Sequence, residues 1–198
     1  MPNLTAKAQI TYRNDMPSIP ATICLAMSLL LLTGCSFGRH KDRQQDGPPD
    51  HTFDASRIPD AVPKPLARST YGNPRSYTAL GKRYWVLPSA KNYSKTGIAS
   101  WYGKKFHGRL TSSREPYSMY AMTAASPNLP LPTFVRVSNL SNGREVIVKV
   151  NDRGPFAPNR IIDLSYAAAI KLDMIKTGTA MVRVTAIDPT QKQKKAEK

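Results

Sequence analysis

The feature that most constrains the fold of this chain is a strand that ends in a tight turn, between Val146 and Phe156. Valines alternate with isoleucine and lysine along 146–150, and this period of two predicts a strand with one buried face. The run Asn-Asp-Arg-Gly-Pro at 151–155 then favours a turn. Rigid backbone at the end of a sheet would hold Asp152 open to solvent and ligand. Asp152 is therefore a candidate functional residue, although a tight turn with a surface ion pair to Arg153 explains the same residues.

The N-terminus is typical of an exported lipoprotein. Two basic residues precede a short apolar run from Ile23 to Leu32, which is followed by Thr33-Gly34-Cys35. This pattern predicts a secretory signal and is too short for a comfortable membrane span. Its end resembles the bacterial lipobox, in which the cysteine is diacylated and becomes the mature N-terminus; the alternative is a signal peptide with an incidental cysteine. We therefore expect 1–35 to be a lipoprotein signal peptide and Cys35 to anchor the chain in a lipid bilayer.

The residue after the lipobox cysteine indicates in which of the two membranes the protein is anchored. Ser36 stands where an inner-membrane retention signal usually has aspartate. We therefore expect a lipid-anchored protein that faces the periplasm, with the outer membrane favoured over the cell (inner) membrane.

Charge and cysteine content narrow the function classes. The chain carries 29 Lys and Arg against 13 Asp and Glu, a net charge of +16, which makes nucleic acid the first partner to consider. The export signal argues against that partner, so we expect no nucleic acid. His40, His51 and His107 are scattered and the chain has only two cysteines. The sequence therefore predicts no metal site, and we expect no cofactor.

Composition divides the rest of the chain into four segments. Residues 36–70 are rich in proline and polar side chains and are expected to form a disordered linker. Residues 71–95 are rich in aromatic side chains and glycine, and we interpret them as an arm that packs on the domain; a sugar-stacking platform is the alternative. The domain is expected at 96–188, and 189–198 form a basic tail.

Within the domain, alternating or apolar runs predict short strands near 97–103, 119–125, 134–137, 145–150, 160–164 and 179–187. Asn142-Gly143 favours a hairpin turn. Ser165 is a good N-cap for a helix of about two turns at 166–172. Several short strands with one small helix indicate a mainly β fold, a compact closed barrel with a thin core.

Five blocks in the same order resemble the rare lipoprotein A (RlpA) family, and together they cover roughly 71–187. They are Tyr71-Gly72-Asn73-Pro74, the run 97–103, Leu129-Pro130-Leu131-Pro132, the run 151–156 and the run 162–169. The resemblance implies a six-stranded double-psi β-barrel with one or two short helices. It also implies an endolytic lytic transglycosylase, which cuts peptidoglycan glycan strands; the best-known members act on strands that lack stem peptides.

The resemblance also implies which residues form the site. Glu115 and Tyr117 fall on the acid and the tyrosine of the family's Gly-Glu-x-Tyr-Asp segment. Asp152 falls on the aspartate of Asn-Asp-Arg-Gly-Pro-Phe. The resemblance thus implies catalytic roles for Asp152 and Glu115.

Three positions depart from the family pattern. Arg114 replaces a glycine, Ser118 an aspartate, and Ser126 the histidine of the family's Thr-Ala-Ala-His segment. That histidine is expected to line the active cleft, so Ser126 predicts weakened activity. The family often adds a C-terminal peptidoglycan-binding repeat, which we do not expect before Lys198; contact with the cell-division machinery is not implied without it.

Lytic cleavage after N-acetylmuramic acid uses no water. An acid protonates the leaving oxygen, an oxocarbenium-like centre develops, and the sugar's own C6 hydroxyl closes a 1,6-anhydro ring, so one carboxyl group can act as acid and then as base. We predict that Asp152 is this group, with a pKa raised by burial or by the charge of Glu115. Arg153 is then expected to pair with Asp163 or a backbone carbonyl.

The remaining candidates would contact substrate. Trp101, Tyr102 and Tyr117 can stack on sugar rings, although a tryptophan in such a strand is as often part of the core; Ser126 and Arg153 complete the expected substrate-binding set. Asp163 has a functional claim, and capping the turn before the helix is the alternative. His107 is expected at the surface.

Two functions therefore remain for a chain that we expect to be a monomer on peptidoglycan. The first is a lytic transglycosylase. The second is a non-catalytic glycan-binding or wall-loosening barrel, which Ser126 favours.

Overall fold

The structure is a computed structural model, and it describes residues 46–190. The apolar run at 23–32, the lipobox Cys35 and the basic tail from 191 onward lie outside the described residues. Within 46–190, no helix has both the length and the apolar character that a membrane crossing requires.

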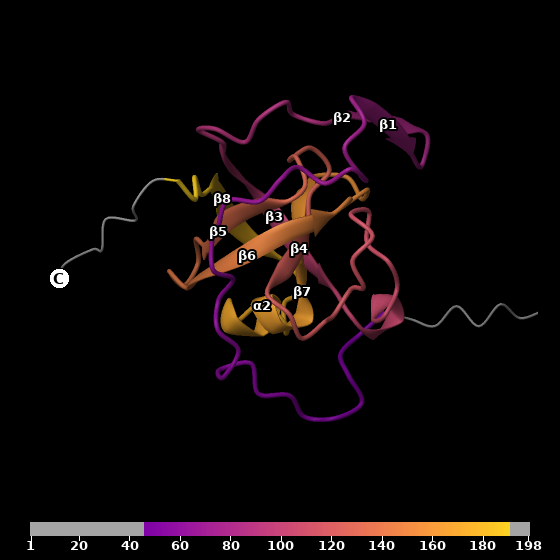
Figure 1. The fold of residues 1–198 in the computed structure, drawn as a ribbon. Helices are drawn as coiled ribbons and strands as arrows, with labels where there is room; N and C mark the ends of the chain where they lie inside the picture. The colour runs from indigo at the N-terminus through magenta and orange to yellow at the C-terminus, as the bar shows by residue number, and fades with distance from the viewer. Residues whose placement is uncertain (1–45, 191–198) are drawn as a thin grey trace, which may run out of the picture. The chain divides into compact units, whose positions relative to one another are not determined.

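Six strands close into a barrel in the order β3-β7-β4-β6-β5-β8 (Figure 1). Their bounds are β3 (Ser94–Tyr102), β4 (Thr123–Ala125), β5 (Thr133–Asn139), β6 (Glu145–Asp152), β7 (Arg160–Ser165) and β8 (Ala180–Ala186). β3 with β7 and β4 with β6 are parallel pairs, and the other neighbours are antiparallel. The mainly β, six-stranded double-psi barrel predicted from the sequence is confirmed.

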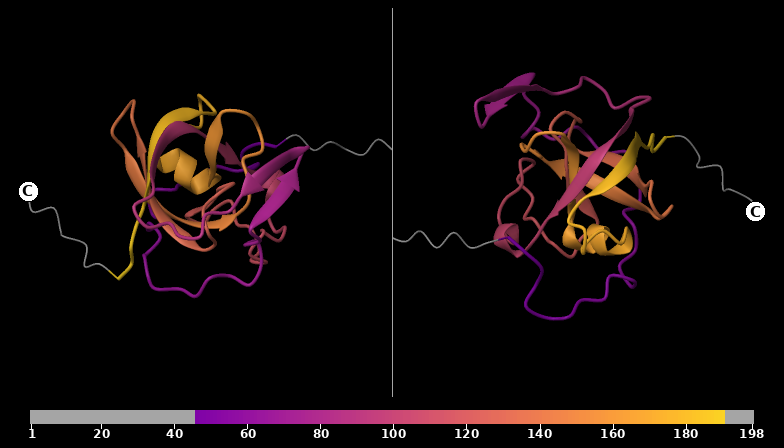
Figure 2. Two further views of the ribbon diagram at one scale, coloured as in Figure 1. Left: turned by 90° about the horizontal axis from the view of Figure 1, so that it is seen from above. Right: turned by 180° about the vertical axis from the view of Figure 1, so that it is seen from behind.

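The barrel interior is filled by the apolar faces of its strands. Val148 and Val150 of β6 and Val135 and Val137 of β5 are fully buried, as the period of two predicts. The helix α2 (Tyr166–Lys171) closes one end of the barrel (Figures 1 and 2). Its three alanines are fully buried, and the hydroxyl of Ser165 accepts a hydrogen bond from the Ala168 N–H at 3.3 Å. The predicted N-cap is therefore confirmed.

One expected strand is shorter than predicted. The alternation at 119–125 forms a strand only at β4, and the residues before it belong to the loop that follows the short 3-10 helix η1 (Lys104–Phe106). The Met119 N–H donates to Nδ1 of His107 at 3.2 Å, and the Met119 carbonyl accepts from the Ala167 N–H at 3.0 Å. Because the loop and the helix take these backbone groups, they do not join a sheet.

The segment 46–70 was expected to be part of a disordered linker, and the structure corrects this for the described residues. It runs as a strap along the barrel, in indigo in Figure 1. Ala55 is 1% exposed, and Asp60 accepts from the Ile147 N–H at 2.9 Å and bonds to Lys171. The reason is that the strap contributes apolar side chains to the core, Phe53 and Ile58 among them, in addition to the bonds of Asp60. Positions 36–45 lie outside the described residues.

A glycine permits the strap to reach the barrel. The Gly103 N–H donates to both carboxylate oxygens of Asp46, at 3.0 and 3.1 Å. A Cβ at Gly103 would lie 2.0 Å from the Gly47 carbonyl oxygen. A side chain at 103 would therefore displace the start of the strap.

The arm at 71–95 contains a hairpin of β1 (Ser76–Ala79) and β2 (Lys82–Trp85). Tyr77 and Tyr84 stack on each other with ring centroids 5.4 Å apart, and Phe156 lies 5.5 Å from Tyr84. The Tyr77 hydroxyl donates to the Pro127 carbonyl at 2.9 Å. These two tyrosines pack on the domain, as expected of the arm, whereas Trp85 is 54% exposed.

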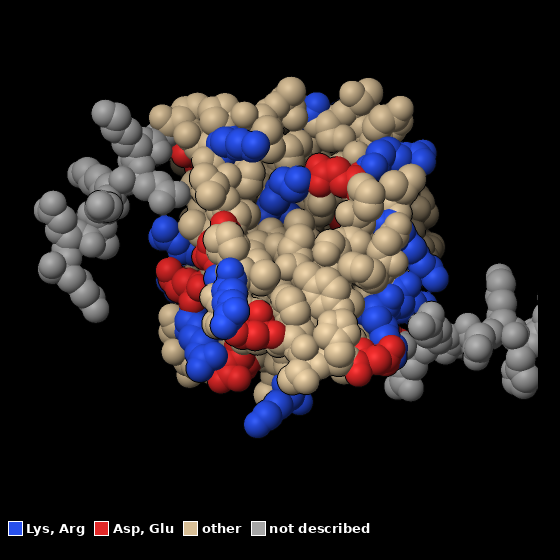
Figure 3. All heavy atoms as spheres, turned by 60° about the horizontal axis from the view of Figure 1, so that its bottom comes forward, with Lys and Arg blue, Asp and Glu red and all other residues tan. Residues whose placement is uncertain are grey.

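Charges of both signs share the face shown in Figure 3, where acidic and basic side chains lie together around an uncharged centre. Ion pairs link the strap acids to cations, as Asp50 to Lys104 at 2.5 Å and Asp54 to Arg57 at 3.8 Å. This face therefore offers no surface of a single sign to a polyanion.

Candidate active site

Asp152 occupies the last position of β6, where the sequence predicts it. Its Oδ1 accepts three hydrogen bonds: from the Ser112 N–H at 2.8 Å, the Ser112 hydroxyl at 2.7 Å and the Arg153 N–H at 2.7 Å. Oδ2 has no hydrogen-bond partner within residues 46–190. One oxygen of the carboxyl group is thus fixed in place, and the other is available to a ligand.

Glu115 reaches the same end of β6 from the loop before β4. Its Oε2 accepts from Lys149 Nζ at 2.7 Å and from Asn151 Nδ2 at 2.8 Å. Partial burial raises the pKa of Glu115, but the bonds from Lys149 and Asn151 outweigh it, and the net result is a lowered pKa. Glu115 is therefore an ionised group whose charge Lys149 compensates.

The turn at 111–115 carries Ser112, which bonds to Asp152, and Glu115 itself. The Thr111 N–H donates to the Glu115 carbonyl at 2.8 Å, and the Ser113 N–H donates to the Asn151 carbonyl at 3.3 Å. Arg114 has φ +68 and its guanidinium lies 5.3 Å from the Tyr71 ring centroid. A positive φ suits glycine, the residue that the family has at this position. The arginine therefore adopts a strained backbone conformation, and its guanidinium contacts the Tyr71 ring.

Arg153 binds protein oxygens in this structure, and its expected substrate-binding role stays a prediction. Its guanidinium donates to the carbonyls of Gly72 at 2.8 Å, Ser126 at 3.0 Å and Leu129 at 2.5 Å, and to Asn73 Oδ1 at 3.1 Å. The expected pairing with a backbone carbonyl is confirmed, and the pairing with Asp163 is not formed. Burial lowers the pKa of Arg153 from its ordinary value. Arg153 thus ties the arm and the loop after β4 to the end of β6.

Ser126 and Tyr117 are also buried, and their expected contact with substrate stays a prediction. Ser126 is 1% exposed, and its hydroxyl accepts from the Leu129 N–H at 3.3 Å. Tyr117 is 3% exposed, and its hydroxyl donates to the Tyr102 carbonyl at 2.6 Å. Burial also raises the pKa of Tyr117 well above its ordinary value. Both side chains therefore pack beneath the candidate site.

The two strand aromatics pack inside the protein as well. Trp101 is half-buried against the barrel core, with its ring 5.5 Å from that of Tyr166. Tyr102 is 8% exposed and stacks on Tyr117 with ring centroids 4.1 Å apart. The alternative interpretation of Trp101 as a core residue is therefore supported, and the sugar-stacking role is not.

Asp163 lies in the strand that the sequence predicts at 160–164, but it does not cap the turn before the helix. It lies inside β7 and accepts from the Ser100 hydroxyl instead of capping the helix. Burial raises its pKa against the effects of Ser100 and Arg160. Ala125 of β4 is paired with Asp152 on one side and with Asp163 on the other. The two aspartates therefore belong to the strands on either side of one residue of β4.

Ser112 was not singled out from the sequence. It supplies two of the three bonds to Asp152 from a position 40 residues earlier in the chain. A serine in a Thr-Ser-Ser run carries no local signal for such a contact. Within residues 46–190, no group of three or more His, Cys, Asp or Glu side chains is placed to hold a metal ion.

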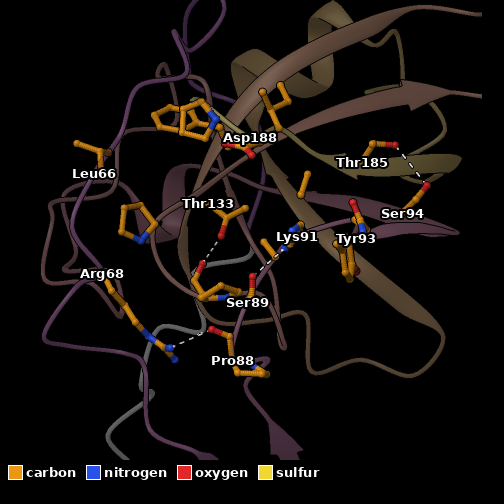
Figure 4. A pocket seen from close by; sticks show the side chains of 18 of the residues that line it. Leu66, Arg68, Pro88, Ser89, Lys91, Tyr93, Ser94, Thr133, Thr185 and Asp188 are labelled. Atoms are coloured by element: carbon orange, nitrogen blue, oxygen red, sulfur yellow. Dashed lines mark hydrogen bonds between the residues drawn. The ribbon is translucent and has the colours of Figure 1, made fainter. Parts of the chain in front are cut away.

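Two cavities lie near the hairpin arm. The larger, of about 650 Å³, is lined by strap residues, the segment 88–94 and the facing ends of β5 and β8 (Figure 4). The smaller, of about 270 Å³, is lined by β2, the start of β3 and residues of 155–161. None of the expected site residues lines either cavity. The two carboxylates therefore lie outside both of these cavities.

Comparison with known proteins decides the family. Residues 94–184 match the model of the family described as "Lytic transglycolase". The barrel is a lytic transglycolase domain. The match spans β3 to β7 in full and most of β8 of this lytic transglycolase domain, together with Asp152, Glu115 and Asp163.

Curated relatives extend the match beyond the lytic transglycolase domain. "Endolytic peptidoglycan transglycosylase RlpA" of Pseudomonas aeruginosa (strain UCBPP-PA14) is 48% identical over 188 residues, which are 87% of this chain and 54% of that protein. The protein of the same name from Vibrio cholerae serotype O1 is 46% identical over 173 residues, 85% of this chain and 65% of that protein. The chain thus spans about half to two thirds of the length of these relatives. The resemblance to the rare lipoprotein A family is confirmed.

Proposed function

We propose that this chain is a lytic transglycosylase. It cleaves the β-1,4 bond between N-acetylmuramic acid and N-acetylglucosamine in glycan strands of peptidoglycan and leaves 1,6-anhydromuramic ends. The observation that carries the proposal is the Asp152 carboxyl group, with one oxygen held by three donors and the other without a partner in residues 46–190. The lytic transglycolase barrel and the names of the relatives support it.

Asp152 performs the proton transfers in this proposal. Protonated Oδ2 donates its proton to the glycosidic oxygen, the bond from that oxygen to C1 of the muramic residue breaks, and positive charge develops at C1. The C6 hydroxyl oxygen of the same residue then bonds to C1, and its proton returns to Oδ2. The net change moves one proton from O6 to the leaving oxygen, so neither water nor a cofactor is consumed.

Glu115 has a positioning role. Because its charge is compensated by Lys149 and its oxygen holds Asn151, it fixes the residue beside Asp152 and the turn that carries Ser112. An anchored turn keeps the two Ser112 donors aligned on Oδ1. Preorganisation of this kind removes the need to reorder the site when substrate binds.

A non-catalytic glycan-binding barrel is the second candidate function. The observation that favours it is Ser126, a buried side chain at the position where the family has a histidine in its cleft. A binding module would retain the cleft and lose the reaction.

One digestion separates the two candidates. Purified chain is incubated with sacculi and with glycan strands stripped of stem peptides, and 1,6-anhydromuramic ends are measured by mass spectrometry. Release of anhydro ends above a no-protein control is expected, with more from stripped strands. Binding of stripped strands with no anhydro product would contradict the transglycosylase and support the binding module.

For location, we propose that acylated Cys35 anchors the chain in the outer membrane, where the domain faces peptidoglycan as a monomer. The lipobox and Ser36 support this. The segment 36–45 then connects the lipid anchor to the strap that begins at Asp46.

A further inference from the structure

The smaller cavity is a basic recess beside the hairpin arm. Four cationic residues line it, Lys82, Arg83, Lys95 and Arg160, and no acidic residue does. They come from the consecutive strands β2 and β3 and from β7, which lies about 60 residues later in the chain. A recess of about 270 Å³ with charge of one sign is complementary to a small anionic group.

Three of these cations lack acidic partners. Within residues 46–190, no ion pair involves Lys82, Arg83 or Lys95. Lys82 lies 5.5 Å from the ring centroid of Tyr84, and Arg83 lies 6.0 Å from that of Trp85. Aromatic rings orient a cation without neutralising it. The positive charge at the recess is therefore available to a ligand.

The recess is lined by residues that lie close in sequence to the two aspartates. Pro155 lines it three residues after Asp152. Ile161 also lines it, and because side chains alternate along a strand, Ile161 and Asp163 project from the same face of β7. A polymer that crosses Asp152 along this face would meet the recess with its next unit.

We propose that this recess is a subsite for carboxylate groups of the bound glycan strand. The ligand is a carboxylate-bearing amino sugar, and the choice of peptidoglycan as the polymer rests on the proposed function. In strands without stem peptides each muramic residue carries a free lactyl carboxylate. The recess is slightly smaller than the roughly 300–1,000 Å³ of drug-sized ligand pockets, so it fits one sugar and its lactyl group better than a stem peptide. The subsite therefore selects strands from which the peptides have been removed.

The larger cavity provides a matched control. Lys64, Arg68 and Lys91 line it, but so does Asp188, and the Arg68 guanidinium donates to the Pro88 carbonyl at 3.4 Å (Figure 4). Lys64 and Lys91 can be replaced by glutamate with the same change in net charge as replacing Arg83 and Lys95. All four side chains belong to residues that are exposed or half-exposed, so neither pair disturbs the core.

The test measures binding of glycan fragments to the full chain that carries Asp152→Asn, which prevents turnover. Three probes are compared: stripped fragments with free lactyl carboxylates, the same fragments with these carboxylates methyl-esterified, and fragments that retain stem peptides. The starting protein is expected to bind the free-carboxylate probe at least about ten-fold more tightly than the ester. Arg83→Glu with Lys95→Glu should remove that preference, and Lys64→Glu with Lys91→Glu should keep it.

Equal binding of the ester and the free acid by the starting protein would overturn the subsite. So would an equal loss in both double variants, since that reports net charge and not a site. Tighter binding of the peptide-bearing probe would overturn the lactyl assignment and transfer the role to stem-peptide carboxylates. Unchanged melting temperatures of both variants exclude unfolding as the cause.

Failure of the two proposals is distinguishable. If the chain without Asp152→Asn releases no anhydro ends but prefers free acid over ester, the transglycosylase fails and the subsite stands. If it releases anhydro ends equally from free-acid and ester strands, the reaction stands and the subsite fails.

Discussion

At the residue scale, Asp152 combines an anchored oxygen with an available one. Ser112 and the Arg153 N–H fix Oδ1, and this fixes the direction in which Oδ2 presents or receives a proton. A group that acts first as acid and then as base needs such a fixed position, because both proton transfers occur within one bound substrate. Asp163, two strands away, is not needed for this sequence of steps.

Ser126→His is expected to destabilise the chain and not to raise its rate. The serine is 1% exposed and its hydroxyl holds the turn to Leu129, so an imidazole overpacks the site and costs about 1–3 kcal/mol. Urea unfolding measures the loss, and Ser118→His, at an exposed or half-exposed position of the same loop region, is the control. A faster, equally stable Ser126→His variant would contradict this burial.

Glu115→Gln is expected to lower stability at neutral pH by at most about 1 kcal/mol, because both partners of the ion pair are partly solvated. The folded chain lowers the pKa of Glu115 below 4.5, so its contribution is present above that pH and is lost as pH falls through the lowered value. The gap between wild type and variant should therefore close in acid. Melting temperatures across pH check this, and Glu145→Gln, whose ion pair with Arg136 is longer at 3.7 Å, is the control.

At the element scale, the local residue pattern predicts the barrel strands. It does not predict the segments that pack on the outside of the barrel. The alternation of 145–150 and the Ser165 cap sufficed to place β6 and α2, because both signals are local. The strap could not be predicted, because its order depends on contacts between Asp60 and groups about 90 or more residues later. The burial of Tyr117 and Ser126 could not be predicted for the same reason. It depends on contacts with segments that are distant in the sequence, which the neighbouring residues do not indicate.

Asp60→Ala is expected to detach the strap from β6 and α2. The change leaves the Ile147 N–H and the Lys171 ammonium group without this partner, at a cost of about 1–3 kcal/mol. Limited proteolysis within 46–60 should accelerate. Asp54→Ala is the control, since Asp54 bonds only locally, to Ser56 and Arg57. Equal protease sensitivity of the two variants would show that Asp60 does not hold the strap.

At the scale of the whole molecule, we propose that a lipid anchor holds the barrel near the glycan polymer. The lipobox supplies this anchor in our account, although Cys35 lies outside the described residues. Cys35→Ala should leave the precursor unprocessed and unlabelled by a palmitate analogue. Density-gradient fractionation of the wild type should place it with outer-membrane markers. Normal processing and labelling of the variant would refute the lipoprotein interpretation.

The central claim is that Asp152 transfers the proton that breaks the glycan. Asp152→Asn keeps the size of the side chain, and its carbonyl oxygen can still accept from Ser112 and Arg153, so folding and glycan binding should persist. The decisive measurement is the yield of 1,6-anhydromuramic ends from stripped glycan strands by wild type and by Asp152→Asn at equal concentration. We predict measurable release by the wild type and at least about a hundred-fold less by the variant, in line with the roughly 10²–10⁴-fold contribution of a general acid–base group. Equal release by the two proteins would contradict the account.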